Sequence, residues 1–275
     1  MKIKSFHNPN ISFPVIRRQA AGLFLDILFV YLEMGPHPFR WINRCCFSRK
    51  GTYSAAVYRL KKAGVIARRG TEYNSPRLAL TDEGRKRVSD VLKPENLWKR
   101  GWNGIWYILT YDIPEGNRRY RDALRGFLHR MRMGCLQKSV WVTPIDIRPE
   151  FHDLTLAADI DRYAFLFEST NVLRRSNRDI VYSAWDFEEL NMVQSWYRKV
   201  YSENLLRLES GHFSEEQMIT LMREEMSAYL VAMEEDPILP VELWPSGYHG
   251  EEVFRIHTQL VKEIRRRLKN GSKHA

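Results

Sequence analysis

Nine basic residues and no acidic residue occupy the stretch between Glu33 and Glu72. A surface with only cations attracts the phosphate backbone of duplex DNA, because binding releases the counterions condensed there. Residues 1–103 hold 20 Lys and Arg against 7 Asp and Glu, a net charge of +13; the whole chain has +10, so residues 104–275 sum to −3. The positive charge is therefore local. It predicts a nucleic-acid-binding module, with a solvated basic face that has no partner as the alternative.

Three successive helices are predicted in and before this stretch. Arg18–Met34 repeats apolar side chains at helical spacing, and Phe39–Phe47 predicts a short second helix. Thr52 suits the N-cap of a third helix that runs to about Ala63. That helix is expected to stop at Gly64, because glycine tolerates the left-handed backbone of a helix C-terminus.

Two short strands are predicted after the third helix. Val65–Arg69 and Arg77–Leu80 flank a polar loop, and Thr81 caps a further helix through about Leu92. Three helices and a two-stranded wing form a winged helix-turn-helix, whose third helix enters the major groove while the wing contacts backbone or minor groove. A helical subdomain that only packs against the rest is the alternative. The residues predicted to contact DNA are Arg49, Lys50, Thr52, Tyr53, Ser54, Tyr58, Arg59, Lys61, Lys62, Arg68 and Arg69.

Composition and length point to a cytoplasmic protein of two or three domains. The longest apolar run, Ala20–Leu32, contains a charged residue and is shorter than the roughly 20 residues of a membrane span. The N-terminus lacks the apolar core and cleavage site of a signal peptide. The three cysteines, Cys45, Cys46 and Cys135, show no metal-ligand spacing and are read as reduced thiols. No membrane partner and no cofactor are expected.

The middle of the chain alternates strands with helices. Ile105–Tyr111 is a β-rich apolar run, Asn117–Met133 an amphipathic helix, and Leu136–Val142 a second strand. A short helix over Glu150–Asp159 and a third strand over Tyr163–Glu168 follow. Helices on one face of such a sheet predict a split βαβ, ferredoxin-like α+β unit.

Motifs in the middle and C-terminal thirds resemble one known family. The segment from Trp106 to Glu115 and the segment Gln137–Pro144 resemble the Cas2-like central domain of the PaaX family of transcriptional repressors. Ala184–Leu190 and especially Asp236–Pro245 strengthen the resemblance. The family pattern implies a bacterial, dimeric repressor that binds a double-stranded DNA operator, controls a catabolic operon and is released by an acyl-CoA ligand. In the family's namesake this ligand is phenylacetyl-CoA.

An alternative function, as a metal-dependent nuclease, depends on Asp112. It matches the position at the end of the first strand where Cas2 nucleases have a metal-binding aspartate, and such a carboxylate can hold Mg²⁺ and activate water. Neighbouring Glu115 and Asp122 form no recognisable ligand pattern. A structural Asp112, which accepts hydrogen bonds from the following backbone or from Arg118, is therefore the preferred interpretation. The Cas2-like metal-dependent nuclease remains the alternative, and no metal site is otherwise expected.

Three domains follow from these patterns: a winged helix-turn-helix over 1–92, a ferredoxin-like domain over 93–170, and a helical C-terminal domain over 171–275. The last is predicted from helices at Glu188–Glu203, Glu215–Glu234 and Glu251–Leu268, and is expected to serve dimerisation or ligand response. Arginines of the helix predicted at Asn117–Met133 are expected either to contact phosphates or to form a solvated face. An acyl pocket or the protein core is the predicted place of Trp185, Trp196 and Trp244.

Overall fold

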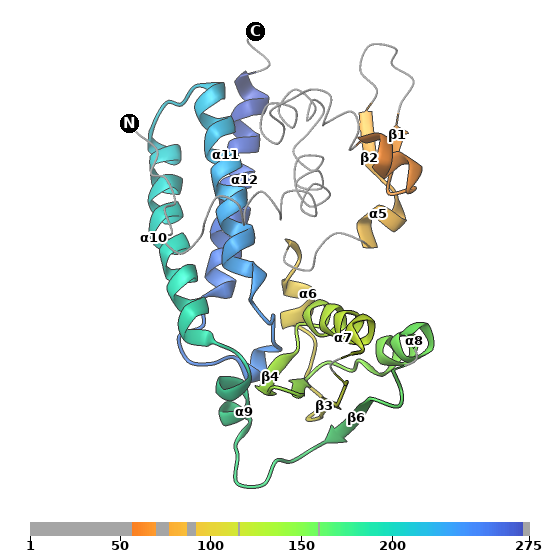
Figure 1. Ribbon diagram of the computed structural model, residues 1–275. Helices are drawn as coiled ribbons and strands as arrows, with labels where there is room; N and C mark the ends of the chain where they lie inside the picture. The colour runs from red at the N-terminus through yellow and green to blue at the C-terminus, as the bar shows by residue number, and fades with distance from the viewer. Residues whose placement is uncertain (1–56, 70–76, 87–91, 115, 159, 272–275) are drawn as a thin grey trace. The chain divides into compact units, whose positions relative to one another are not determined.

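A computed structural model describes residues 57–69, 77–86, 92–114, 116–158 and 160–271 (Figure 1). The chain divides into two compact units that do not follow chain order. The central unit comprises residues 94–192 and 234–250, and the flanking unit comprises 1–93, 193–233 and 251–275. The predicted helices Arg18–Met34 and Phe39–Phe47 lie outside the described residues. The division into three consecutive domains stays a prediction.

A four-stranded antiparallel sheet organises the central unit. The strand order is β4-β5-β3-β6, so the first strand lies between the third and the last, as in a ferredoxin-like fold. The predicted α+β class with a ferredoxin-like centre is confirmed. Its elements are α6 (Glu95–Trp98), β3 (Trp106–Tyr111), α7 (Arg118–Arg130), β4 (Gly134–Gln137), β5 (Val140–Thr143), α8 (Arg148–Ala158) and β6 (Ala164–Ser169).

One strand prediction was wrong. The predicted second strand Leu136–Val142 is not a single strand but part of a hairpin, in which β4 and β5 pair on either side of a turn at Lys138 and Ser139. The register shifts between Cys135 and Gln137, so a bulge accompanies the turn. The hairpin supplies the fourth strand that a split βαβ fold requires.

Alternating residues of β3 build two cores, one on each face of the sheet. Tyr107 and Leu109 are buried against α7 and α8, together with Phe127. Trp106 points to the other face, where α9 (Asn177–Ala184) and the 3₁₀ turn η2 (Val241–Leu243) cover the sheet (Figure 1). Because side chains alternate along a strand, a sheet covered on both faces needs apolar residues at consecutive positions. The apolar run of β3 satisfies this requirement.

A buried carboxylate fixes the connector between the last two helices. Asp236 is fully buried, and its carboxylate accepts hydrogen bonds from the Ile238 N–H at 2.8 Å and the Tyr248 hydroxyl at 2.8 and 3.0 Å. The same hydroxyl accepts a hydrogen bond from Trp98 Nε1 at 3.1 Å. Gly250 lies so close that an added Cβ would meet the Tyr248 oxygen at 2.1 Å. The Asp236–Pro245 motif is therefore structural in the central unit.

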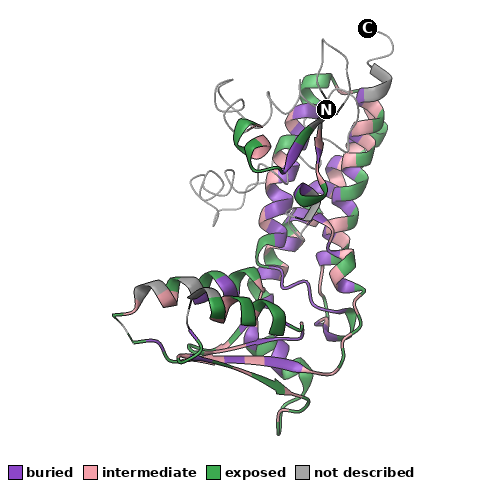
Figure 2. Cartoon of the chain, turned by 90° about the vertical axis from the view of Figure 1, so that its right-hand side faces the viewer, coloured by how far each residue is buried: buried purple, intermediate pink, exposed green. Residues whose placement is uncertain are grey.

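Three long helices form the C-terminal region, as predicted: α10 (Phe187–Ser210), α11 (Glu215–Glu234) and α12 (Gly250–Gly271), which run side by side (Figures 1 and 2). The first of them continues past the predicted end at Glu203. None of the helices in the described part of the chain is both long and apolar enough to cross a lipid bilayer.

Polar side chains join the three helices inside their shared core. Glu225 of α11 is 1% exposed, and its Oε1 accepts hydrogen bonds from the Tyr197 hydroxyl of α10 at 2.5 Å and from His257 Nδ1 of α12 at 2.8 Å. Burial and the neighbouring carboxylate raise the pKa of Tyr197 well above its usual value, so its hydroxyl stays a donor. The His257 ring also stacks on Tyr229 at 3.9 Å.

Candidate nucleic-acid interface

The described part of the third helix covers residues 57–62, and it ends as the sequence predicts. Gly64 has φ of +70°, its N–H donates to Lys61 O at 3.0 Å, and the Val65 N–H donates to Leu60 O at 3.0 Å. This pair of hydrogen bonds is the Schellman motif, which satisfies carbonyls left free at a helix end. Glycine suits the position because side chains disfavour positive φ.

Side chains of this helix divide into two faces. Tyr58 is 66% exposed, and Arg59 and Lys62 are also exposed. Leu60 and Lys61 are half-buried. The described helix thus brings together three of the predicted contact residues on its exposed side: one aromatic ring and two cations. Arg49, Lys50, Thr52, Tyr53 and Ser54, which were also predicted to contact DNA, lie outside the described residues.

The wing is a two-stranded antiparallel hairpin formed by β1 (Ile66–Arg69) and β2 (Arg77–Leu80). At its base Ile66 pairs with Leu80, and both are buried. Next to the loop that connects the two strands, Arg69 lies opposite Arg77 in the register. Arg77 was not among the residues predicted to contact DNA; the strand register pairs it with Arg69, which was.

After the wing, β2 leads into α5 (Asp82–Lys86), which begins at the predicted cap Thr81. The Gly84 N–H donates to Thr81 Oγ1 at 3.0 Å, the bond expected of an N-cap. The acidic residues at its first turn, Asp82 and Glu83, complement the positive end of the helix dipole. The order helix, wing, helix therefore agrees with a winged helix-turn-helix over the described residues.

Several arginines of the C-terminal helices are paired with carboxylates of these helices. On α12, Arg266 and Arg267 contact Glu263 at 2.6 Å. These two guanidinium groups lower the pKa of Glu263 to about 2, with the hydrogen bond from Arg266 as the largest cause. Arg198 likewise contacts Glu252 at 2.5 Å. Such pairs have little net charge to offer a polyanion.

Asp112 lies directly after β3, at the strand end where the sequence places it. Its backbone N–H donates to Tyr163 O at 2.8 Å, and its side chain is exposed. Asp122 on α7 is exposed as well, while Glu115 lies outside the described residues. Among the described residues, no group of three His, Cys, Asp or Glu side chains could hold a metal ion.

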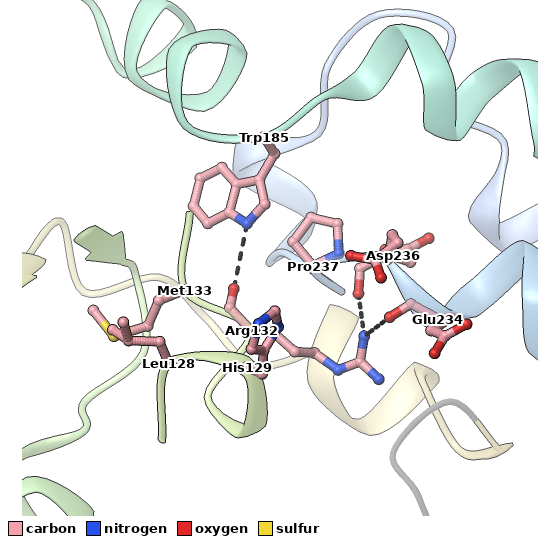
Figure 3. A pocket seen from close by; sticks show the side chains of 9 residues that line it. Leu128, His129, Arg132, Met133, Trp185, Glu234, Asp236 and Pro237 are labelled. Atoms are coloured by element: carbon pink, nitrogen blue, oxygen red, sulfur yellow. Dashed lines mark hydrogen bonds between the residues drawn. The ribbon is translucent and has the colours of Figure 1, made fainter. Parts of the chain in front are cut away.

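A pocket of about 350 Å³ lies in the central unit, at the end of α7 (Figure 3). Arg132 Nη1 donates to the carbonyl oxygens of Glu234 at 3.0 Å and Asp236 at 2.5 Å, and Trp185 Nε1 donates to Arg132 O at 3.3 Å. His129 completes the polar lining beside two exposed carboxylates. Because both signs of charge line this pocket, its chemistry selects no single ligand class.

The three candidate tryptophans have different surroundings. Trp185 lines this pocket, while Trp196 is 44% exposed on α10. Trp244 packs edge-on against Trp98 at 5.8 Å and donates to Leu239 O at 2.9 Å. The structure therefore does not bring the three together in one acyl pocket.

Known proteins are similar to this chain in sequence over the central unit and in fold. Residues 99–181 match the family model of the PaaX protein central Cas2-like domain. Among solved structures, the uncharacterized protein Rv0674 from Mycobacterium tuberculosis is similar, with a TM-score of 0.52 and 19% identity, over 87% of this chain and 95% of that chain. At this identity the likeness shows a shared fold alone. No curated protein matches the chain significantly. The family match confirms the predicted resemblance: residues 99–181 of this chain are similar to the central Cas2-like domain of the PaaX family.

Proposed function

We propose that the protein is a cytoplasmic, non-enzymatic DNA-binding repressor of the PaaX type. One observation carries the proposal: an exposed helix face with Tyr58, Arg59 and Lys62 precedes a hairpin in which Arg69 pairs with Arg77 next to the connecting loop. Both lie in a sequence region with a strong excess of cations. A helix reads base edges and a cationic hairpin contacts phosphates, so the two together suit duplex DNA.

Selection from a random-sequence duplex pool tests this function directly. The full-length protein should enrich a two-fold related sequence and bind it far more tightly than unrelated duplex in a gel-shift assay at physiological salt. Mg²⁺ should leave the bound duplex intact. Failure to enrich any sequence, with only weak and uniform binding, would contradict the sequence-specific regulator.

A two-fold operator implies a homodimer, since symmetric half-sites mirror a symmetric protein. Phe165 and Phe167 support this part of the proposal. They lie on β6, which is at the edge of the sheet, and are 58% and 52% exposed. Edge strands with exposed apolar residues readily pair with a second edge. Light scattering should show a dimer that dissociates more easily in Phe165→Ser/Phe167→Ser, whereas wild-type monomer at micromolar concentration would contradict it.

An acyl-CoA-like ligand is proposed to release the operator. Such a ligand acts only if it binds the DNA-free state more tightly than the DNA-bound state. The resemblance to the PaaX family supports this choice. Titration calorimetry with phenylacetyl-CoA, other acyl-CoAs and free CoA, with and without operator, tests it. We expect the protein to bind an acyl-CoA but not free CoA. Its affinity for the acyl-CoA should fall when operator is present.

A further inference from the structure

Thr81 connects three elements of the wing module, which consists of the helix at 57–62, the hairpin of β1 and β2, and helix α5. Its hydroxyl donates to Gly64 O at 2.6 Å and lies 3.1 Å from Val65 O, while its backbone N–H donates to Val65 O at 3.1 Å. The same hydroxyl oxygen accepts the hydrogen bond from the Gly84 N–H. One side chain therefore ties the end of the helix at 57–62 to the start of α5, across 17 residues of sequence.

Gly84 allows this close approach. It is buried, and a Cβ added there would lie 2.0 Å from Val65 O and 3.2 Å from Leu80 Cδ2. The first distance is far below any real Cβ contact, so backbone would have to move. Only glycine lets the first turn of α5 rest on the segment that joins the helix to β1.

This segment is where the helix and the wing are joined. Gly64 has φ of +70° and is the turn between them, and glycine permits many backbone conformations. A wing attached only through this turn is free to pivot. Thr81 and Gly84 hold both sides of the turn from a third element, which restricts the pivot.

We propose that Thr81 and Gly84 are positioning residues that hold the wing at a fixed offset from the DNA-reading helix. This inference rests on the proposed function, since the offset matters only if helix and wing contact one duplex. Prepositioned groups bind without the entropic cost of ordering on contact. Loss of the tie therefore removes wing–phosphate contacts while the helix still reads its bases.

The matched variants are Thr81→Val, which keeps the shape but removes the hydroxyl, and Thr81→Ser, which keeps the hydroxyl. Thr81→Val should bind the selected duplex about fivefold to thirtyfold more weakly. Its log K against log salt slope should be smaller by roughly one for each phosphate that the wing no longer neutralises. Hydroxyl-radical protection at the wing should weaken while protection at the helix stays. Thr81→Ser should restore affinity, slope and protection.

Outcomes separate the inference from the proposed function. Wild type that binds no selected duplex contradicts the function itself. Wild type that binds, together with folded Thr81→Val of unchanged salt slope and wing protection, overturns the positioning role alone. If Thr81→Val does not fold, amide hydrogen exchange of wild type decides. Thr81 and Gly84 amides that exchange as fast as unstructured amides show that the tie is open, and they too overturn the inference.

Discussion

The exposed cations of the wing module and those of helix α12 have different surroundings. Around the helix at 57–62, the sequence contains no acidic residue from 34 to 71. On α12, by contrast, Glu263 holds both Arg266 and Arg267. A cation paired within its own helix must lose that partner before it contacts phosphate. The distribution of charge along the sequence, rather than the total amount of charge, therefore distinguishes the candidate DNA surface.

The largest effect is expected at the polar cluster of the helical region, because its side chains are buried from solvent. Replacing His257 by Phe keeps a ring against Tyr229 but leaves Glu225 in the core without its histidine partner. Removing one partner of a buried hydrogen bond costs about 1–3 kcal/mol of unfolding free energy. Urea unfolding followed by circular dichroism measures the loss.

The control for this prediction is the triple variant Tyr197→Phe/Glu225→Leu/His257→Phe, which removes all three polar groups of the cluster. It should recover much of the lost stability, since an apolar replacement of a buried pair is often neutral. Glu225 Oε2 accepts no hydrogen bond from the described residues, so part of its desolvation is already uncompensated. A His257→Phe variant as stable as wild type would show that the pair adds nothing.

Arg59→Ala tests the wing-module side of the comparison. Loss of an exposed base-reading arginine should weaken binding of the selected duplex by about 1–3 kcal/mol and affect random duplex little. The matched control is Lys262→Ala, which removes one exposed charge from α12. Its effect should be within about 0.5 kcal/mol. Equal losses for both variants in fluorescence anisotropy would mean that net charge alone drives binding.

Arg68→Ala and Arg69→Ala test whether the wing contacts phosphate. Both residues lie on β1, and Arg69 faces Arg77 across the hairpin. Each substitution should weaken all duplexes alike and reduce the salt slope by roughly one. Anisotropy titrations at several salt concentrations provide the slope. A changed base preference with an unchanged slope would assign sequence reading to the wing instead.

Asp112→Asn should have the smallest effect. The side chain is exposed, so the change in stability is expected to be within about 0.5 kcal/mol and operator binding should persist. Incubation of labelled duplex and single strands with Mg²⁺ or Mn²⁺ checks the chemistry. Cleavage by wild type but not by Asp112→Asn would replace the regulator with the nuclease alternative.

Local signals in the sequence predicted much of the fold. The stop at Gly64, the cap at Thr81 and the apolar run of β3 each depend on neighbouring residues, which is why they could be predicted. The hairpin of β4 and β5 was missed because Lys138 and Ser139 lack the glycine or asparagine that marks most tight turns. The predicted end of the long helix α10 was too early: Leu205 and Leu208 continue its apolar repeat past Glu203, and Leu208 is buried.

The sequence by itself determined the charge segregation, the helix and strand types and the family resemblance, because these depend on residue identity and short spacing. Only the tertiary structure decided which distant groups meet. Thr81 contacts Gly64, Arg69 lies opposite Arg77, and Glu225 joins His257 inside the helical core. Their physical origin is packing: burial of apolar faces brings chain segments together, and polar groups trapped there must find partners that no local pattern specifies.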